Sequence, residues 1–240
     1  AMRVRGPVGT TVEITMLRDT ELVEFSIERA TILIPDVRSE RLEDDIGYIA
    51  LAQFSPDARE EIETALDELD PSTLQGLIFD LRGNGGGLFD SAIDVASLLV
   101  DSGTILYEDF GDSEITISAR GNALDLDGVP VVLLVDELSA SASEIVAGAW
   151  KDYGVATLIG ETTFGKGTVQ TWNTLVNGGG IRLTIARWLT PDRSWIHDQG
   201  INPDIEVIWT PTTAEEAAVD LQLQAALELL TEQQIAMPGS

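Results

Sequence analysis

Three short apolar runs constrain the fold of this chain more than any other feature of its sequence. They are "LIFDL" (77–81), "VPVVLLV" (129–135) and "VATLIG" (155–160), and the first two lead into "LFDSAIDVASLLV" and "SASASEIVAGAW", where apolar residues recur at helical spacing. Continuous apolar runs of this length are typical of strands that are buried on both faces. Because such strands alternate with helices here, the sequence predicts an α/β fold in which helices cover a largely parallel sheet.

The N-terminal part follows a different pattern. Residues 10–34 alternate apolar and polar positions on both sides of the turn-like Asp19-Thr20-Glu21, which predicts a β-hairpin. A two-stranded ribbon is only marginally stable by itself. We therefore expect this hairpin either to pack on the main body or to be the remainder of a larger domain upstream.

Two predicted helices have recognisable ends. The segment "SPDAREEIETALDELDP" predicts a helix with Ser55 as N-cap, Pro56 at its first position and Pro71 as its stop. A C-terminal helix is expected from about Thr213, because Thr213 and Glu216 fit a capping box. The apolar residues of this helix fall on one face, which contains Val219, Leu223, Leu227 and Leu230.

The chain is strongly acidic. It has 41 acidic against 14 basic residues, a net charge of −27 and only two lysines, Lys151 and Lys166. A surface of this charge repels phosphate backbones and anionic lipids, which excludes nucleic acid and such membranes as partners. Dense carboxylates with little lysine suit a high-salt source, because salt screens their mutual repulsion. A melting temperature that stays the same in low and molar salt would contradict this hypothesis.

Several kinds of site are excluded by composition. The chain has no cysteine, so it has no disulfides, no thiolate chemistry and no cysteine-based metal site. We expect neither a metal nor a cofactor. No apolar run approaches the length of a membrane span, and the N-terminus lacks the pattern of a signal peptide.

The glycine loop "RGNGGG" (82–87) lies between a predicted strand and a predicted helix. Leu88 breaks the G-x-G-x-x-G pattern of dinucleotide-binding folds, and no Lys-Ser/Thr pair follows as it does in a P-loop. Two interpretations remain. The loop is either a tight turn or a site whose free backbone N–H groups stabilise an oxyanion.

Three serines, Ser139, Ser141 and Ser143, occupy the next predicted strand-to-helix junction. A nucleophilic serine needs such a junction, because there its hydroxyl is exposed and the N–H groups of the helix start face the developing oxyanion. Serines are also common N-cap and first-turn residues. A catalytic role therefore requires a group that takes the serine proton.

Two residues could take that proton. His197, the only histidine, lies in the loop "SWIHDQGINPD". Asp198 is the only neighbouring residue that suggests a Ser-His-Asp triad. Lys166 lies between two glycines in "TFGKG" and is otherwise explained as an exposed turn lysine. A lysine accepts a proton only when it is neutral, so this role requires apolar surroundings without acidic side chains. Lys151 is explained by its favourable place at a helix C-terminus.

Three segments, taken in order, resemble the C-terminal processing peptidases, also called tail-specific proteases. They are "LIFDLRGNGGGLFDSAIDVASLLV", "VPVVLLVDELSASASEIVAGAWKDYGVATLIGETTFGKGTVQTW" and "IRLTIARWLTPDRSWIHDQGINPDIEV". The resemblance covers about residues 30–210. It implies a crotonase-like or Clp-protease-like α/β core with a mixed sheet and covering helices.

The resemblance also implies a Ser-Lys active site. Ser141 matches the family's nucleophile, Lys166 its general base, and Gln170 the glutamine that orients the lysine. The backbone N–H groups of Gly87 and Ala142 match its oxyanion hole. The implied reaction is peptide hydrolysis through an acyl-enzyme, with no cofactor or metal.

The chain departs from the family at its N-terminus. Family members carry a PDZ domain that captures substrate C-termini, whereas here only "RGPVGTTVEITMLRDTELVEFSIERATI" resembles the last strands of that domain. We therefore expect the C-terminal strands of a truncated PDZ domain at 1–30, the protease core at 31–212, and a C-terminal helix and tail at 213–240. Members mostly act outside the cytoplasm, which implies an extracytoplasmic location (periplasmic, secreted or luminal).

Three functions remain open at this level. The first is a serine endopeptidase that cleaves proteins or peptides near apolar C-terminal tails, as a monomer or a homo-oligomer. The second is a catalytically silent or latent peptide-binding core that lacks its PDZ activator. The third is a crotonase-like acyl-transfer enzyme that uses the glycine loop on a thioester. Covalent labelling of Ser141 separates the first from the second, and a thioester assay tests the third.

Overall fold

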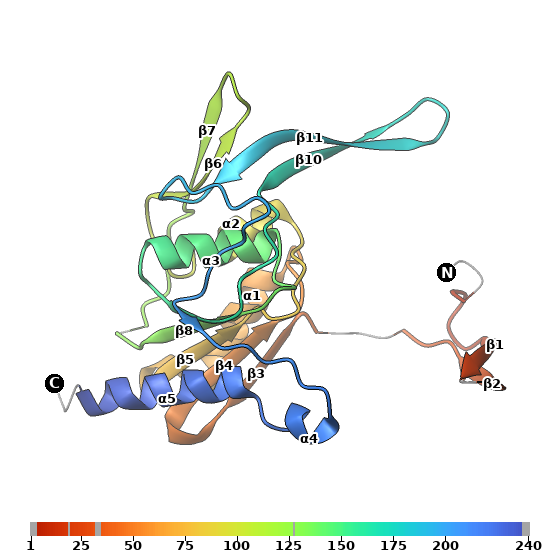
Figure 1. The fold of residues 1–240 in the computed structure, drawn as a ribbon, viewed down its shortest axis with the longest axis horizontal. Helices are drawn as coiled ribbons and strands as arrows, with labels where there is room; N and C mark the ends of the chain where they lie inside the picture. The colour runs from red at the N-terminus through yellow and green to blue at the C-terminus, as the bar shows by residue number, and fades with distance from the viewer. Residues whose placement is uncertain (1–3, 19, 32–34, 127, 237–240) are drawn as a thin grey trace. The chain divides into compact units, whose positions relative to one another are not determined.

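The computed structural model describes residues 4–18, 20–31, 35–126 and 128–236 and divides the chain into two compact units, 1–35 and 36–240. The larger unit is a mixed α/β structure, and the smaller one is an antiparallel hairpin. The predicted fold class, an α/β core with a mixed sheet and covering helices plus an N-terminal hairpin, is confirmed (Figure 1).

The N-terminal unit consists of β1 (Thr11–Arg18) and β2 (Glu21–Glu28). The two strands pair antiparallel in a continuous register from Thr11↔Glu28 to Arg18↔Glu21. Most of their side chains are exposed, including the apolar Met16, Leu17, Leu22 and Ile27. The alternation of the sequence is therefore that of a strand pair, but little of its apolar surface is buried within the unit.

The core of the larger unit is a six-stranded sheet in the order β12-β9-β8-β5-β4-β3. All neighbours pair parallel except β3 and β4, which are antiparallel. The bounds are β3 (Val37–Arg41), β4 (Ile46–Leu51), β5 (Gly76–Asp80), β8 (Val131–Val135), β9 (Thr157–Gly160) and β12 (Ile205–Glu206). Every residue of β5 and β8 is buried, as expected for central parallel strands.

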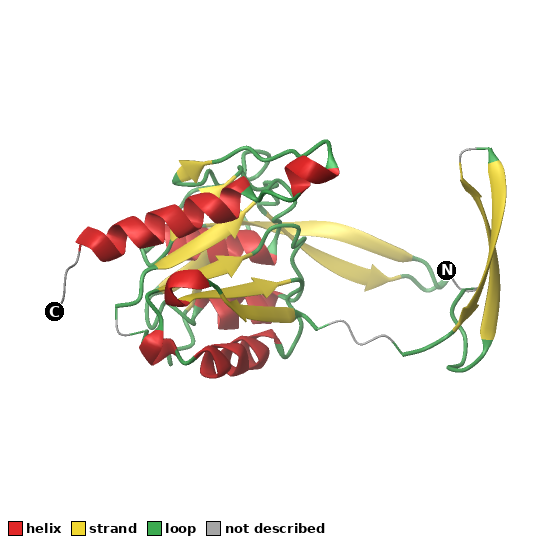
Figure 2. Cartoon of the chain, turned by 90° about the horizontal axis from the view of Figure 1, so that it is seen from below, coloured by secondary structure: helices red, strands yellow, loops and turns green. Residues whose placement is uncertain are grey.

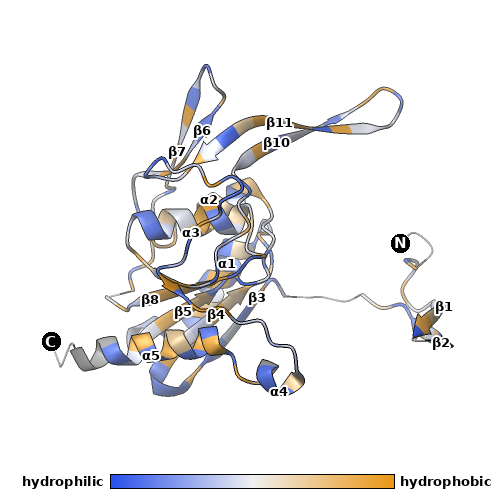
Figure 3. Cartoon of the chain, viewed as in Figure 1, coloured by the Kyte–Doolittle hydropathy of each residue, from blue (hydrophilic) through white to orange (hydrophobic). Residues whose placement is uncertain are grey.

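Helices cover both faces of this sheet (Figures 1 and 2). On one face, α1 (Ala58–Leu69), α2 (Phe89–Ala96) and α3 (Ala142–Asp152) share a core with the inward side chains of the strands. On the other face, α5 (Leu221–Ala236) packs Ala226 and Leu230 against residues such as Ile78 and Leu134. Figure 3 shows apolar strands between these layers. The glycine loop follows the carboxyl end of β5, and the turn before α3 follows the carboxyl end of β8. The candidate site is built on these two segments.

A second sheet, in the order β10-β11-β6-β7, lies beyond α2 and α3. Its strands are β6 (Thr104–Asp109), β7 (Glu114–Ser118), β10 (Thr168–Thr174) and β11 (Gly180–Leu189). β11 pairs with β6 only over its last three residues, so the rest of β10 and β11 forms a two-stranded arm that projects from the core (Figure 1). Within this sheet β10 is an edge strand.

Two predicted helix boundaries are wrong. The first helix begins at Ala58 rather than at Pro56, and Ser55 contributes only its carbonyl, which accepts from the N–H of Ala58 at 3.4 Å. The C-terminal helix is two helices. The predicted capping box of Thr213 and Glu216 starts only α4 (Ala214–Ala217), and α5 begins at Leu221.

The break between α4 and α5 has a physical cause in Asp220. Its carboxylate accepts the backbone N–H of Leu223 at 2.9 Å, which caps α5, and it forms an ion pair with Arg82 at 2.8 Å. Val219, expected on the apolar face, lies outside the helix and is exposed, whereas Leu223, Leu227 and Leu230 contribute to the core under α5. No helix among the described residues is long and apolar enough to span a membrane.

Candidate active site

Ser141 occupies the sharp turn between β8 and α3. It is the N-cap residue of α3, and its backbone is held at φ 58° and ψ −110°. Positive φ is unfavourable for a residue with a side chain, costs roughly 1–3 kcal/mol and persists only where the surrounding structure imposes it. A serine in this conformation at a strand-to-helix turn is typical of a nucleophile whose hydroxyl is presented to substrate.

The two neighbouring serines have other tasks. Ser139 is fully buried and donates its hydroxyl to the carbonyl of Leu81 at 2.8 Å. Ser143 is also fully buried and donates to the carbonyl of Asn84 at 2.8 Å. Both hydroxyls thus bond the segment around Ser141 to the backbone of residues 81–84. Of the three candidates, Ser141 alone combines a strained backbone with partial exposure.

The glycine loop packs directly against the Ser141 turn. A Cβ on Gly86, whose φ is +104°, would lie 2.9 Å from Cβ of Ser141 and 3.1 Å from the nitrogen of Ala142. Only glycine permits this approach. Within the described residues, neither the N–H of Gly87 nor that of Ala142 donates a hydrogen bond to the protein. Two free amide donors on adjacent segments are what an oxyanion requires.

Asn84 holds the glycine loop in this position. Its side chain is fully buried, donates to the carbonyl of Leu51 at 2.8 Å and accepts the N–H of Gly86 at 2.9 Å. Its own carbonyl accepts the N–H of Ala140 at 3.1 Å. The loop is therefore preorganised before any ligand binds, which lowers the cost of stabilising charge there.

Lys166 lies in a turn that precedes β10. The turn is packed closely, since a Cβ on Gly165, whose φ is +88°, would lie within 2.9–3.1 Å of three backbone nitrogens of the loop at 198–200. The Lys166 side chain is half-buried. Among the described residues, its ammonium group has no ion pair and no hydrogen bond.

The carboxylate of Glu144 joins this turn to Ser141. Its Oε2 accepts the N–H of Ser141 at 2.8 Å and that of Lys166 at 2.9 Å, and its Oε1 accepts the N–H of Gly165 at 2.6 Å. The expectation of surroundings without acidic side chains is therefore wrong in one respect. An acid does lie against the lysine turn, although it contacts the backbone and not the ammonium.

The structure does not join Gln170 to Lys166. Gln170 is exposed on β10, next to a register shift after Val169, and its side chain donates to Thr184 at a long 3.4 Å. His197 is likewise apart from the serine, with its ring stacked on Trp195 at 5.5 Å. No hydrogen bond between His197 and Ser141 occurs in the described part of the chain.

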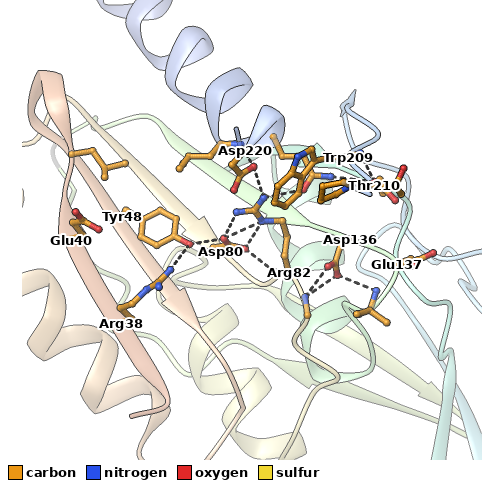
Figure 4. A pocket seen from close by; sticks show the side chains of 17 residues that line it. Arg38, Glu40, Tyr48, Asp80, Arg82, Asp136, Glu137, Trp209, Thr210 and Asp220 are labelled. Atoms are coloured by element: carbon orange, nitrogen blue, oxygen red, sulfur yellow. Dashed lines mark hydrogen bonds and ion pairs between the residues drawn. The ribbon is translucent and has the colours of Figure 1, made fainter. Parts of the chain in front are cut away.

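A buried charge network lies behind the glycine loop, where a cavity of about 550 Å³ opens (Figure 4). Arg82 donates to Asp80 from Nε, at 3.0 and 3.1 Å, and from Nη2, at 2.7 Å, and it donates to Asp220 from Nη1 at 2.8 Å. Burial by itself lowers the pKa of Arg82, but these hydrogen bonds raise it above its usual range. The network ties the start of the loop to α5 and so supports the site from behind.

Tyr48 completes this network. Its hydroxyl donates to Oδ2 of Asp80 at 2.6 Å (Figure 4). Burial, together with the charge of Asp80, raises the pKa of Tyr48 to about 12. Burial by itself would raise the pKa of Asp220, but the hydrogen bond from Arg82 brings it below its usual range. Among the described residues, no group of three potential ligands could hold a metal ion.

Comparison with known proteins decides the family. The family model for peptidase family S41 matches residues 45–207, which contain the glycine loop, the serine turn and the lysine turn. The chain belongs to peptidase family S41. Its fold is that of other S41 protease structures, and the S41 match supports a serine peptidase.

Several relatives of the S41 chain are named as processing proteases. It is 42% identical to a carboxyl-terminal-processing protease of Synechocystis sp., over 96% of this chain and 56% of that protein. It is 39% identical to the carboxy-terminal processing protease CtpA of Bacillus subtilis, over 85% of this chain and 44% of that protein. The solved photosystem II D1 C-terminal processing protease is 32% identical, with a TM-score of 0.68 over 88% of this chain and 59% of that one. The chain thus spans about half the length of these relatives.

Several residues of this S41 site escaped the sequence analysis. Glu144, Asn84 and the ion pair of Arg82 with Asp220 were not singled out. Glu144 had a usable signal, because it stands three residues after Ser141 in the Ser-x-x-Glu spacing of a capping box. Arg82 and Asp220 had none, since 138 positions separate them.

Proposed function

We propose that this chain is a serine endopeptidase that cleaves polypeptides near apolar C-terminal tails, with Ser141 as nucleophile and Lys166 as general base. One observation carries the proposal. A single oxygen of Glu144 accepts the N–H groups of both residues, at 2.8 and 2.9 Å, so the two amides are closer together than the sum of these distances. This shared acceptor supports one site for the strained serine and the unpaired lysine. Membership of family S41 supports the same assignment.

The reaction proceeds by acyl transfer. Neutral Nζ of Lys166 takes the proton of Ser141 as Oγ bonds to the peptide carbonyl carbon, and the resulting oxyanion accepts the N–H groups of Gly87 and Ala142. Collapse of this intermediate breaks the C–N bond, and the leaving amine takes the proton from Lys166. Water then attacks the acyl carbon while it gives a proton to Lys166. The C–Oγ bond breaks as that proton returns to Oγ of Ser141, and the N-terminal fragment leaves as a carboxylic acid.

Gln170 orients the lysine in this scheme. Its long bond to Thr184, at 3.4 Å, is weak enough to exchange for one to the amine when substrate binds. Gln170→Leu should therefore lower kcat, whereas Thr184→Val, which removes the present partner, should leave kcat unchanged. Equal kcat values for Gln170→Leu and the unchanged chain would mean that Gln170 takes no part in the reaction.

An extended peptide has a suitable surface beside these groups. β10 begins two residues after Lys166 and is an edge strand of its sheet, so its outer backbone groups are open to pairing. The arm of β10 and β11 also exposes large apolar side chains, namely Trp172, Leu175, Val176, Ile181, Leu183 and Ile185. Both features support substrates with apolar, unfolded tails.

The wider setting is also a proposal. We infer that β1 and β2 are the last strands of a PDZ domain that delivers substrate tails, and that the protein acts outside the cytoplasm. The hairpin and the processing proteases among its relatives support this setting. Fractionation of the native host, with detection of the protein in cytoplasmic and exported fractions, tests the location. Recovery only from the cytoplasm would contradict it.

The decisive experiment compares cleavage of casein and of a peptide with an apolar C-terminus by the unchanged chain, Ser141→Ala and Lys166→Met. We expect products from the unchanged chain alone, with cuts near the C-terminus of the peptide. Mass spectrometry of acid-quenched reactions should detect an acyl group on Ser141. Cleavage by Ser141→Ala would refute the nucleophile, and cleavage by none of the three would favour a latent peptide-binding core.

A further inference from the structure

The side chain of Glu144 is a buried anion with an unusual set of partners. It lies in the first turn of α3 and is fully shielded from solvent. Besides the amides of Ser141, Gly165 and Lys166, its Oε1 accepts the hydroxyl of Thr163 at 2.7 Å. All four contacts are donors, which suits the ionised form of a carboxyl group. No cation pairs with it among the described residues.

A capping role explains only one of these bonds. In a capping box the glutamate at the third helical position accepts the N–H of the N-cap residue, which here is Ser141. The other three bonds go to residues 163–166, which follow β9 and carry the lysine. An exposed glutamate would cap the helix equally well, so burial of this charge reflects its contacts with the second segment.

The contacts extend one step further through Thr163. Its side-chain oxygen donates to Glu144 and accepts the N–H of Ile201 at 2.8 Å. The adjoining loop at 198–200 packs on Gly165. Glu144 therefore sits where the serine turn, the lysine turn and the loop at 198–201 meet.

We propose that Glu144 is a positioning residue that sets the distance and orientation of Lys166 relative to Ser141. The inference rests on the proposed function, since it concerns the geometry of that reaction. Glu144 does not exchange protons with substrate. Because one oxygen holds both amides, a shift of either segment breaks a bond to a buried charge, and this restricts the two segments to one arrangement. Misplacement of reacting groups by about 1 Å can reduce a rate by about 100-fold.

Glu144→Gln is the sharpest test. The amide has nearly the shape of the carboxylate, but its NH₂ group cannot accept, so in either orientation two of the four donors lose their acceptor. We expect kcat to fall about 100-fold with KM nearly unchanged. Thr163→Val, which removes one bond and leaves the carboxylate, should lower kcat by about 10-fold. Glu228→Gln, the same change at an exposed site on α5, should have no effect.

Amide hydrogen exchange tests the contact without any need for catalysis. In Glu144→Gln we expect faster exchange in two segments at once, 141–145 and 163–167, because the carboxylate joins them. A capping role alone would accelerate exchange in the first segment only. Thr163→Val provides the same readout if Glu144→Gln does not fold.

The outcomes separate the two proposals. If the unchanged chain cleaves and Glu144→Gln has the same kcat per folded molecule, the positioning role is refuted and the proposed function stands. If the unchanged chain cleaves nothing, the proposed function fails, and the exchange data still decide whether Glu144 joins the segments. Lower kcat with faster exchange in both segments supports the inference.

Discussion

The two lysines of the chain lie in opposite electrostatic settings. Lys151, near the end of α3, donates to Asp204 at 2.7 Å and to the carbonyl of Asn202 at 2.8 Å. Lys166 has neither kind of partner for its side chain among the described residues, although the chain carries 41 acidic residues. In so acidic a protein, an unpaired lysine is the less expected arrangement.

This difference supports the proposed role of Lys166 as general base. An amine that serves as general base must lose its proton, and a neighbouring carboxylate would oppose that loss. The carboxylate of Glu144 lies against the backbone of the lysine turn, where it accepts hydrogen bonds from N–H groups. The charge of Glu144 thus contacts the backbone of the lysine turn without forming an ion pair with the ammonium group of Lys166.

The first prediction exchanges each lysine for methionine, which keeps length and removes the amine. Lys166→Met should reduce kcat/KM for peptide cleavage by roughly 10³-fold or more, as removal of a catalytic group does. Lys151→Met should reduce it less than about twofold, because its amine bonds to Asp204 and to the carbonyl of Asn202, neither of which belongs to the proposed site. Initial rates on one fluorogenic peptide measure both. Comparable losses of kcat/KM in the two variants would mean that Lys166 has no special role in cleavage.

The second prediction concerns a cation that is both buried and fully paired. Arg82 bonds to Asp80 and Asp220, and its side chain is 13% exposed. Arg82→Met leaves the Asp80 charge buried without its partner, so we expect the free energy of unfolding to fall by about 3–5 kcal/mol. Urea unfolding followed by fluorescence measures this change. A loss below about 1 kcal/mol would mean that water replaces the guanidinium at Asp80.

The fold could be predicted because its signals are local. Apart from Asp80, the residues of β5 and of β8 are apolar, and all ten positions are buried. The break before α5 has a local signal in Asp220, which caps the helix by accepting the N–H of Leu223. The ion pair of Asp220 with Arg82, which is 138 positions away, could not be predicted from the sequence.

Contacts within the candidate site could likewise not be predicted in full from the sequence. The sequence pointed to Ser141 and Lys166, but the link between them depends on the burial of Glu144 and on its contacts with the turn at 163–166. A Ser-x-x-Glu spacing indicates a capping box in any helix. Whether the glutamate also reaches a second segment is set by tertiary packing, which spacing does not encode.

The third prediction tests the network behind the loop by pH. Tyr48 has a pKa of about 12 against an ordinary value of 10.0, so the folded state prefers the protonated phenol. This preference stabilises the fold fully below pH 10.0 and is lost as the pH rises to about 12. The unchanged chain should lose about 3 kcal/mol more than Tyr48→Phe over this interval. Parallel unfolding curves would contradict the burial of a protonated Tyr48.

The smallest expected effect concerns the paired lysine itself. The side chains of Lys151 and Asp204 are 31% and 39% exposed, so solvent screens their ion pair. Lys151→Met should lower the free energy of unfolding by less than about 1 kcal/mol. Part of the loss is offset because Asp204 keeps its bond from the N–H of Leu158 at 2.9 Å. Urea unfolding in low and molar salt measures the pair, and the difference between the two chains should shrink in salt. A loss above about 2 kcal/mol that salt does not reduce would mean that Lys151 holds the loop around Asn202 in place, and its contrast with the unpaired Lys166 would then be larger than the exposure of its ion pair implies.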